Sequence, residues 1–225
     1  MKLAALISGG KDSLLALYKA HKLGHSVDYL LTMEPESDES YMFHHPNIWI
    51  TDLISKTLNI PLIKGRTHGL KEEELKDLDL LFDRVENNVE GIITGALAST
   101  YQKTRIEKLC EKRGLEALSP LWGFSGERLW KELLEHDFRV MITSVASNGL
   151  DDEWLGKIVD KKDYLELKSL SKKYRFHLGF EGGEAETLVL DMPLYKGRIN
   201  VIEAESSWTG GSGKYKINKA VLEDK

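Results

Sequence analysis

The sequence is nearly free of cysteine, since Cys110 is the only one among 225 residues. No disulfide can form within the chain, so we expect a protein of a reducing compartment, the cytoplasm. The sequence also has no apolar run of membrane length. The run at residues 3–7 is too short for a signal peptide or a membrane span and reads as a buried strand. These absences argue against an exported protein and against a membrane partner.

An excess of positive charge is also missing. The chain has 31 Lys and Arg against 36 Asp and Glu, which gives a formal net charge of −5. A mildly acidic chain has no electrostatic footprint for tight nucleic-acid binding, so we expect no nucleic-acid partner. Internal repeats and low-complexity tracts are absent as well. The oligomeric state stays open between a monomer and a homodimer.

The hydrophobic fraction of 41% is enough to bury a sizeable core. Short apolar runs alternate with helical patterns as far as residue 118, and five of these runs are strand candidates. They lie at residues 2–7, 27–33, 60–63, 91–95 and 115–118. Such alternation predicts an α/β fold, a doubly wound parallel five-stranded sheet with helices on both faces. Ligands bind at the carboxyl ends of such strands, where Gly9, Gly10, Glu34 and Gly95 would lie.

The pattern changes after Trp122, where we place a domain boundary. Residues 1–122 would form the α/β domain and residues 123–225 a smaller α+β domain. Helical patterns span 125–136, with Ser125 as N-cap, and most of 154–174. The apolar positions of the second pattern are Leu165, Leu167, Leu170 and Tyr174. Residues 139–145 are a further strand candidate. The candidates at 187–190, 199–204 and 214–217 are separated by turns, which predicts antiparallel pairing.

The segment SGGKDS, residues 8–13, lies between the first strand and the first helix. Glycines let backbone amides approach a phosphate, and the helix N-terminus adds partial positive charge. Lys11 adds a full charge, whereas Asp12 suits a Mg²⁺ ion on the phosphates. The spacing is neither that of a P-loop nor that of a dinucleotide fingerprint. A turn whose glycines serve geometry alone is the alternative, and the full set disfavours it: Ser8, Gly9, Gly10, Lys11, Asp12 and Ser13.

A second segment, EGGEAET at residues 181–187, gathers three carboxylates around two glycines. Glu181, Glu184 and Glu186 repel one another, so the loop calls for a cation: Mg²⁺, ammonium or a cationic substrate group. The alternative is a solvated acidic turn. The apolar run that follows favours a constrained loop on a scaffold.

A third segment begins at Gly95, at the end of a strand, and places polar side chains just beyond it. Arg105 can stabilise negative charge on a carboxylate or phosphate. For Glu107, a position on a solvated helix face is the alternative. Cys110 fits the apolar face of the same helix and is expected in the core. The candidate residues of this segment are Gly95, Tyr101, Gln102, Arg105 and Glu107.

Residues 8–13 resemble the PP-motif of the N-type ATP pyrophosphatases, enzymes that split ATP between the α and β phosphates. The resemblance implies that this segment holds the β and γ phosphates. It also implies that Gly95 lies near the α-phosphate and the ribose. Met33, at the end of the second strand, would line the adenine.

The three segments together resemble one family, the diphthine–ammonia ligases of the archaeal single-module form. Two further segments add to the match: residues 41–44, YMFH, and residues 118–122, LSPLW. The resemblance implies that ATP adenylates the carboxylate of diphthine on translation elongation factor two. Free ammonium would then give the amide, since no glutaminase signature is present.

This resemblance makes residues 1–122 a PP-loop ATP-binding domain and residues 123–225 a substrate-binding domain. It also assigns roles to the candidate residues, with ATP and Mg²⁺ as cofactors. Lys11, Asp12 and Arg105 would be catalytic, and Asp12 would hold the metal. The substrate-binding residues would be His44, Tyr101, Gln102, Glu107, Glu181, Gly183, Glu184 and Glu186.

Two other functions stay open. One is a different PP-motif ligase that amidates or thiolates a tRNA or a small carboxylate, although no CxxC pair is present for thiolation. The other is a sensor that binds ATP without turnover. A sensor has little use for a metal-binding Asp12 inside the phosphate loop, which favours an enzyme.

Overall fold

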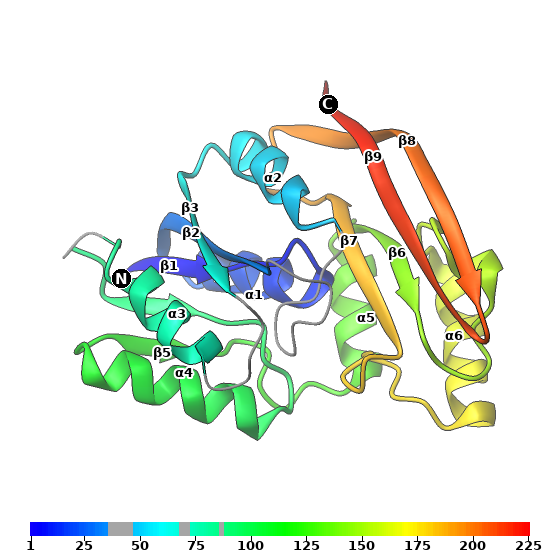
Figure 1. The fold of residues 1–225 in the computed structure, drawn as a ribbon, viewed down its shortest axis with the longest axis horizontal. Helices are drawn as coiled ribbons and strands as arrows, with labels where there is room; N and C mark the ends of the chain where they lie inside the picture. The colour runs from blue at the N-terminus through cyan, green and yellow to red at the C-terminus, as the bar shows by residue number, and fades with distance from the viewer. Residues whose placement is uncertain (36–46, 68–72, 86–87) are drawn as a thin grey trace. The chain divides into compact units, whose positions relative to one another are not determined.

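The computed structural model describes residues 1–35, 47–67, 73–85 and 88–225. The chain divides into two compact units, Met1–Trp122 and Gly123–Lys225, whose elements are labelled in Figure 1. No helix in the described ranges is long and apolar enough to cross a membrane.

The first unit contains a five-stranded sheet in which all neighbouring strands are parallel. In spatial order the strands are β3 (Leu62–Thr67), β2 (Ser26–Pro35), β1 (Lys2–Leu6), β4 (Gly91–Ile93) and β5 (Glu116–Leu118). The helices are α1 (Lys11–Lys22), α2 (Thr51–Leu58, after the 3-10 turn η1, Ile48–Ile50), α3 (Glu73–Phe82) and α4 (Thr100–Lys112). The predicted α/β fold is therefore confirmed. The strand order reverses between β1 and β4, because β2 and β3 lie on one side of β1 and β4 and β5 on the other. The carboxyl ends of β1 and β4 therefore flank the switch point of the sheet.

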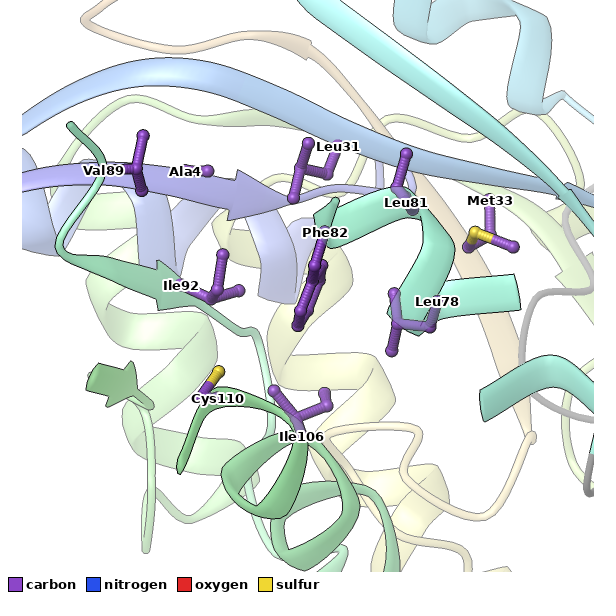
Figure 2. Close-up of a cluster of buried hydrophobic side chains, with 10 residues drawn as sticks. All are labelled: Ala4, Leu31, Met33, Leu78, Leu81, Phe82, Val89, Ile92, Ile106 and Cys110. Carbon is purple, nitrogen blue, oxygen red and sulfur yellow. The ribbon is translucent and has the colours of Figure 1, made fainter. Parts of the chain in front are cut away.

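A hydrophobic cluster fills the space between one face of this sheet and helices α3 and α4 (Figure 2). Its buried members are Ala4, Leu31, Met33, Leu78, Leu81, Phe82, Val89, Ile92, Ile106 and Cys110. Cys110 is 1% exposed, and burial raises the pKa of its thiol to about 12. It is therefore the inert core residue that the sequence predicts.

Helix α1 covers the opposite face of the sheet. Alternation along the strands turns Leu3, Ala5 and Leu30 away from the cluster of Figure 2, and all three are fully buried. Leu14 and Leu15 of α1 are also fully buried, and α1 contacts β1, β2 and β4. Since helices lie on both faces, the strands read as continuous apolar runs rather than as alternating ones.

The second unit is built on an antiparallel sheet. Its strands, in spatial order, are β7 (Ala185–Asp191), β6 (Arg139–Val145), β9 (Ser212–Asp224) and β8 (Gly197–Thr209), and its helices are α5 (Gly126–Glu135) and α6 (Lys161–Tyr174). As predicted, Ser125 caps α5, because its Oγ accepts the Arg128 N–H at 3.2 Å. Trp130 of α5 is fully buried, and its indole N–H donates to the Leu178 carbonyl at 2.9 Å.

The prediction that most of residues 154–174 is helical is confirmed for Lys161–Tyr174, whereas residues 155–160 are not helical. A short 3-10 turn, η2 (Asp152–Trp154), is followed by extended chain, in which Ile158 bridges Met141 of β6. Helix α6 begins only at Lys161, because Asp160 and Asp163 form a capping box there. The apolar positions also divide. Leu167 is fully buried, whereas Leu165 and Tyr174 are 64% and 42% exposed.

Two neighbouring leucines of α3 test the core of the first unit. Leu81 lies in the cluster at 1% exposure, whereas Leu80 is 63% exposed. We expect Leu81→Ala to lower the free energy of unfolding by about 2–5 kcal/mol, because it leaves a cavity. Leu80→Ala is the matched control, with an expected change below about 0.5 kcal/mol. Denaturant unfolding followed by circular dichroism measures both, and equal losses would contradict this account of the core.

Candidate functional site

The phosphate loop, residues 7–13, joins the end of β1 to the start of α1. Gly9 has a φ of 87°, a left-handed conformation that favours glycine. Gly10 is the N-cap of α1 and has no side chain to accept from the first turn. Gly10 therefore places no capping side chain on the amides of the first turn, where the helix dipole puts partial positive charge. The loop has the features of an anion site at the switch point of the sheet.

The two serines of the loop shape it from within. The Ser8 N–H donates to Ser13 Oγ at 3.4 Å, and the Ser13 hydroxyl donates to the Gly10 carbonyl at 3.0 Å. The Gly10 N–H in turn donates to Ser8 Oγ at 3.4 Å. These three bonds close the turn with groups of the loop itself.

Lys11 and Asp12 form an ion pair at the beginning of α1. Lys11 is 2% exposed, and its Nζ lies 2.9 Å from Asp12 Oδ2. The other carboxylate oxygen, Asp12 Oδ1, is buried and has no hydrogen-bond partner within the described part of the chain. That oxygen fits a hard cation such as Mg²⁺. No group of three or more His, Cys, Asp and Glu that could hold a metal ion gathers among the described residues.

Gly95 packs directly on this loop. A Cβ at position 95 would lie 2.7 Å from the Ser13 N and 2.8 Å from the Asp12 carbonyl carbon. Only glycine permits that approach, so β4 ends against the first turn of α1. The structure thereby brings Gly95 together with the residues of the phosphate loop, although they are far apart in the sequence.

Met33 is placed differently from what a contact with adenine requires. Its side chain is 2% exposed and belongs to the cluster of Figure 2. The Met33 side chain packs against Gly65 of β3, where an added Cβ would lie 2.6 Å from the Met33 Sδ. Only the backbone of Met33 can line a nucleotide.

The third segment lies on α4. The guanidinium of Arg105 stacks on the ring of Tyr101, with 3.5 Å between its Cζ and the ring centroid. Stacking uses the face of the guanidinium, whereas hydrogen bonds to a carboxylate or phosphate use its edge. Glu107 lies 3.4 Å from Lys103 in an i,i+4 pair, with its side chain 45% exposed. The solvated helix face considered for Glu107 fits this position better than a binding site does.

Two predicted residues cannot be placed in the site. His44 lies outside the described residues. The backbone of Gln102 belongs to α4, but its side chain is outside the described part of the structure.

In the second unit, the acidic loop is organised by one of its own carboxylates. Glu184 Oε1 accepts the N–H of His177 at 2.8 Å, and Oε2 accepts the N–H of Gly182 at 2.8 Å. Gly183 has a φ of 80°, which favours glycine at this turn. Both oxygens of Glu184 therefore hold the backbone of the loop, while Glu181 is exposed.

Glu186 has the most unusual electrostatics of the loop. It lies in β7 opposite Ser144 of β6, and Ser144 in turn lies opposite Lys214 of β9. Burial raises the pKa of the Glu186 carboxyl from 4.5 to about 7, against the opposing attraction of the Lys214 ammonium. A carboxyl that titrates near neutral pH is common at functional sites.

Sequence reasoning missed the hydroxyl groups at the carboxyl edge of the sheet. Thr94, 4% exposed, follows β4, and its Oγ1 lies 3.2 Å from the Oγ of Ser119, which follows β5. Thr94 Oγ1 also accepts the Ala96 N–H at 3.4 Å, which fixes the turn after Gly95. Their shared position, just after a strand, is the signal that could have revealed them.

Comparison with known proteins covers both units. Residues 1–117 match the family described as "Diphthamide synthase N-terminal domain". Residues 125–222 match the family described as "Diphthamide synthase C-terminal domain". The two matches together span nearly the whole chain.

Similar curated proteins carry the name diphthine–ammonia ligase. The Homo sapiens protein is 38% identical over 226 residues, which cover 91% of this chain and 84% of that protein. The Schizosaccharomyces pombe protein is 35% identical over 245 aligned residues, which cover 100% of this chain but 40% of that protein. The chain thus spans less than half of the fission yeast relative and most of the human one.

A solved structure is also similar, the predicted subunit of a tRNA methyltransferase from Methanocaldococcus jannaschii. The TM-score is 0.45 with 18% identity, over 86% of this chain and 98% of that chain. At this score and identity the likeness carries no argument about function.

The raised pKa of Glu186 predicts a pH dependence of stability. Between pH 4.5 and about 7 the folded protein keeps a proton on this carboxyl that the unfolded chain has lost. The contribution of Glu186 to the free energy of unfolding therefore falls as the pH rises through this window. We expect the free energy of unfolding of Glu186→Gln to rise relative to that of wild type, by up to about 3 kcal/mol, as the pH increases from about 4 to about 8.

Thermal melts across this pH range measure the difference. Glu166→Gln is the control, because Glu166 is an exposed glutamate of α6. A wild-type and a Glu186→Gln protein with parallel pH profiles would contradict the burial of this carboxyl.

Proposed function

Because the chain belongs to the diphthamide synthase family, we propose that it is an ATP-dependent diphthine–ammonia ligase. The reaction adenylates the diphthine carboxylate with release of pyrophosphate, and ammonia then displaces AMP to form the amide. The single observation that carries the proposal is the phosphate loop, closed by its own hydrogen bonds and carrying the Lys11–Asp12 pair, in a chain that matches the family over both units. The protein substrate would be translation elongation factor two, a cytoplasmic protein.

The first unit supplies what the adenylation step requires. ATP and a carboxylate are both anions, so positive charge must bring them together. Lys11 and the amides at the start of α1 would bind the phosphates, and Gly9 and Gly10 place no side chain beside them. Gly95 would act by letting the chain after β4 pack against the first turn of α1. Ser8 and Ser13 are bonded within the loop, which favours a shaping role for both in this account.

Asp12 and Arg105 would act on the charge that develops during adenylation. The buried Oδ1 of Asp12 suits Mg²⁺, which would neutralise phosphate charge and help pyrophosphate to leave. Arg105, held by its stack on Tyr101, suits the substrate carboxylate.

The acidic loop of the second unit suits a cationic nitrogen, either ammonium or the trimethylammonium group of diphthine. Glu186 is the best candidate for the contact, because its carboxyl is the one that burial makes costly to ionise alone. A cation beside it would favour the ionised form. Glu184 would contribute by keeping the loop closed, and Glu181 stands at its exposed entrance.

Mass spectrometry of elongation factor two that carries diphthine tests the proposal. Incubation with the protein, ATP, Mg²⁺ and ammonium should convert the acid to the amide, with a mass decrease of about 1 Da and equimolar AMP. Omission of ammonium or ATP is the control and should prevent amide formation. If AMP is released in the presence of another substrate but never in the presence of diphthine, the protein is a different PP-motif ligase. If ATP binds without turnover under any condition, it is a sensor.

Replacement of Asp12 tests its proposed role as a ligand of Mg²⁺. We expect Asp12→Asn to lower the rate of pyrophosphate release about a hundredfold or more, because the metal loses a charged ligand. Glu107→Gln is the matched control and should keep nearly the full rate, since Glu107 belongs to an exposed i,i+4 pair. A coupled assay for pyrophosphate measures both variants. Unchanged release in Asp12→Asn would remove Asp12 from the site.

A further inference from the structure

A buried hydroxyl in the second half of β2 binds the backbone where the chain enters the phosphate loop. Thr32 has no exposed surface, and its Oγ1 donates to the carbonyl of Ile7 at 2.7 Å. Ile7 comes directly after β1, and its N–H makes the adjoining backbone bond to the Leu31 carbonyl at 2.8 Å. Where the chain leaves the sheet for the loop, a side chain of the neighbouring strand therefore binds the next carbonyl.

The direction of this carbonyl sets the direction of the loop's first amide. The peptide between Ile7 and Ser8 is planar, so its C=O and its N–H point to opposite sides. The bond from Thr32 fixes the Ile7 carbonyl toward β2, so the Ser8 N–H points away from β2. There it donates to the Oγ of Ser13, in α1, at 3.4 Å. The Ser13 hydroxyl passes the constraint on to the Gly10 carbonyl at 3.0 Å. One hydroxyl of β2 thus begins a chain of bonds that ends at the N-cap of α1.

We propose that Thr32 is a positioning residue for the phosphates of ATP, acting through the Ile7–Ser8 peptide. The inference rests on the proposed ATP-dependent function and adds to it a residue outside the SGGKDS segment. Loss of the hydroxyl leaves the buried Ile7 carbonyl without this donor and frees the peptide to rotate. The loop would then bind ATP less tightly, although the fold of the sheet, which depends on apolar burial, would persist.

Three substitutions at Thr32 separate positioning from packing. Thr32→Val keeps the shape and removes the donor, so the dissociation constant for ATP should rise about tenfold. Thr32→Ser keeps the donor and should stay within about twofold of wild type. Thr32→Cys, with a weak donor, should lie between them. Isothermal titration with ATP measures the affinities, and thermal melts record the stability of each variant.

The matched control is Thr143→Val, the same change at a buried threonine of β6 in the other unit, 3% exposed. It should leave the ATP affinity unchanged. Equal affinity in wild type and Thr32→Val, or a Thr32→Ser protein as weak as Thr32→Val, would overturn the positioning role. Should Thr32→Val not fold, equal affinity of the Ser and Cys variants would overturn it. A wild-type protein that binds no ATP would instead overturn the proposed function, and this inference with it.

Discussion

The structure of the first unit depends on the central position of β1. This strand pairs with β2 on one side and β4 on the other, so its carboxyl end cannot move independently of its neighbours. The phosphate loop, which follows β1, is contacted from β2 and from the chain after β4. Thr32 binds the carbonyl of Ile7 from β2, and Gly95 presses on the backbone of Asp12 and Ser13 from the end of β4. A loop of glycines and serines, flexible by composition, is thus constrained by residues of two neighbouring segments.

Much of this fold could be predicted, because burial on both faces leaves a strong signal in sequence. The strands of the parallel sheet are short apolar runs, and Cys110 falls on the apolar side of a helix. The signal weakens where local chemistry competes with periodicity. The capping box at Asp160 starts α6 later than the apolar pattern suggests. Strands β8 and β9 reach 13 residues each, although few of their residues are buried, so apolar periodicity marks only part of their length.

The candidate site could be predicted by residue type better than by role. Met33 and Thr32 are neighbours in β2, yet strand alternation sends one side chain into the core and leaves the other to bind Ile7. Glu184 and Glu186 stand two residues apart in the same motif. One binds backbone amides of its own loop, and the other is desolvated in a strand. The sequence shows a glutamate at both positions. Only the hydrogen bonds and the burial in the structure distinguish Glu184, which shapes the loop, from Glu186, the candidate ligand.

The burial of Cys110 has a practical consequence for the study of motion in this protein. The only thiol of the chain is enclosed in the core, and its raised pKa keeps it from reacting at neutral pH. A cysteine introduced at an exposed position would therefore be the sole target for a maleimide dye, with no need to remove the native residue. Two such cysteines, one in each unit, would report by fluorescence energy transfer whether the distance between the units changes when nucleotide binds.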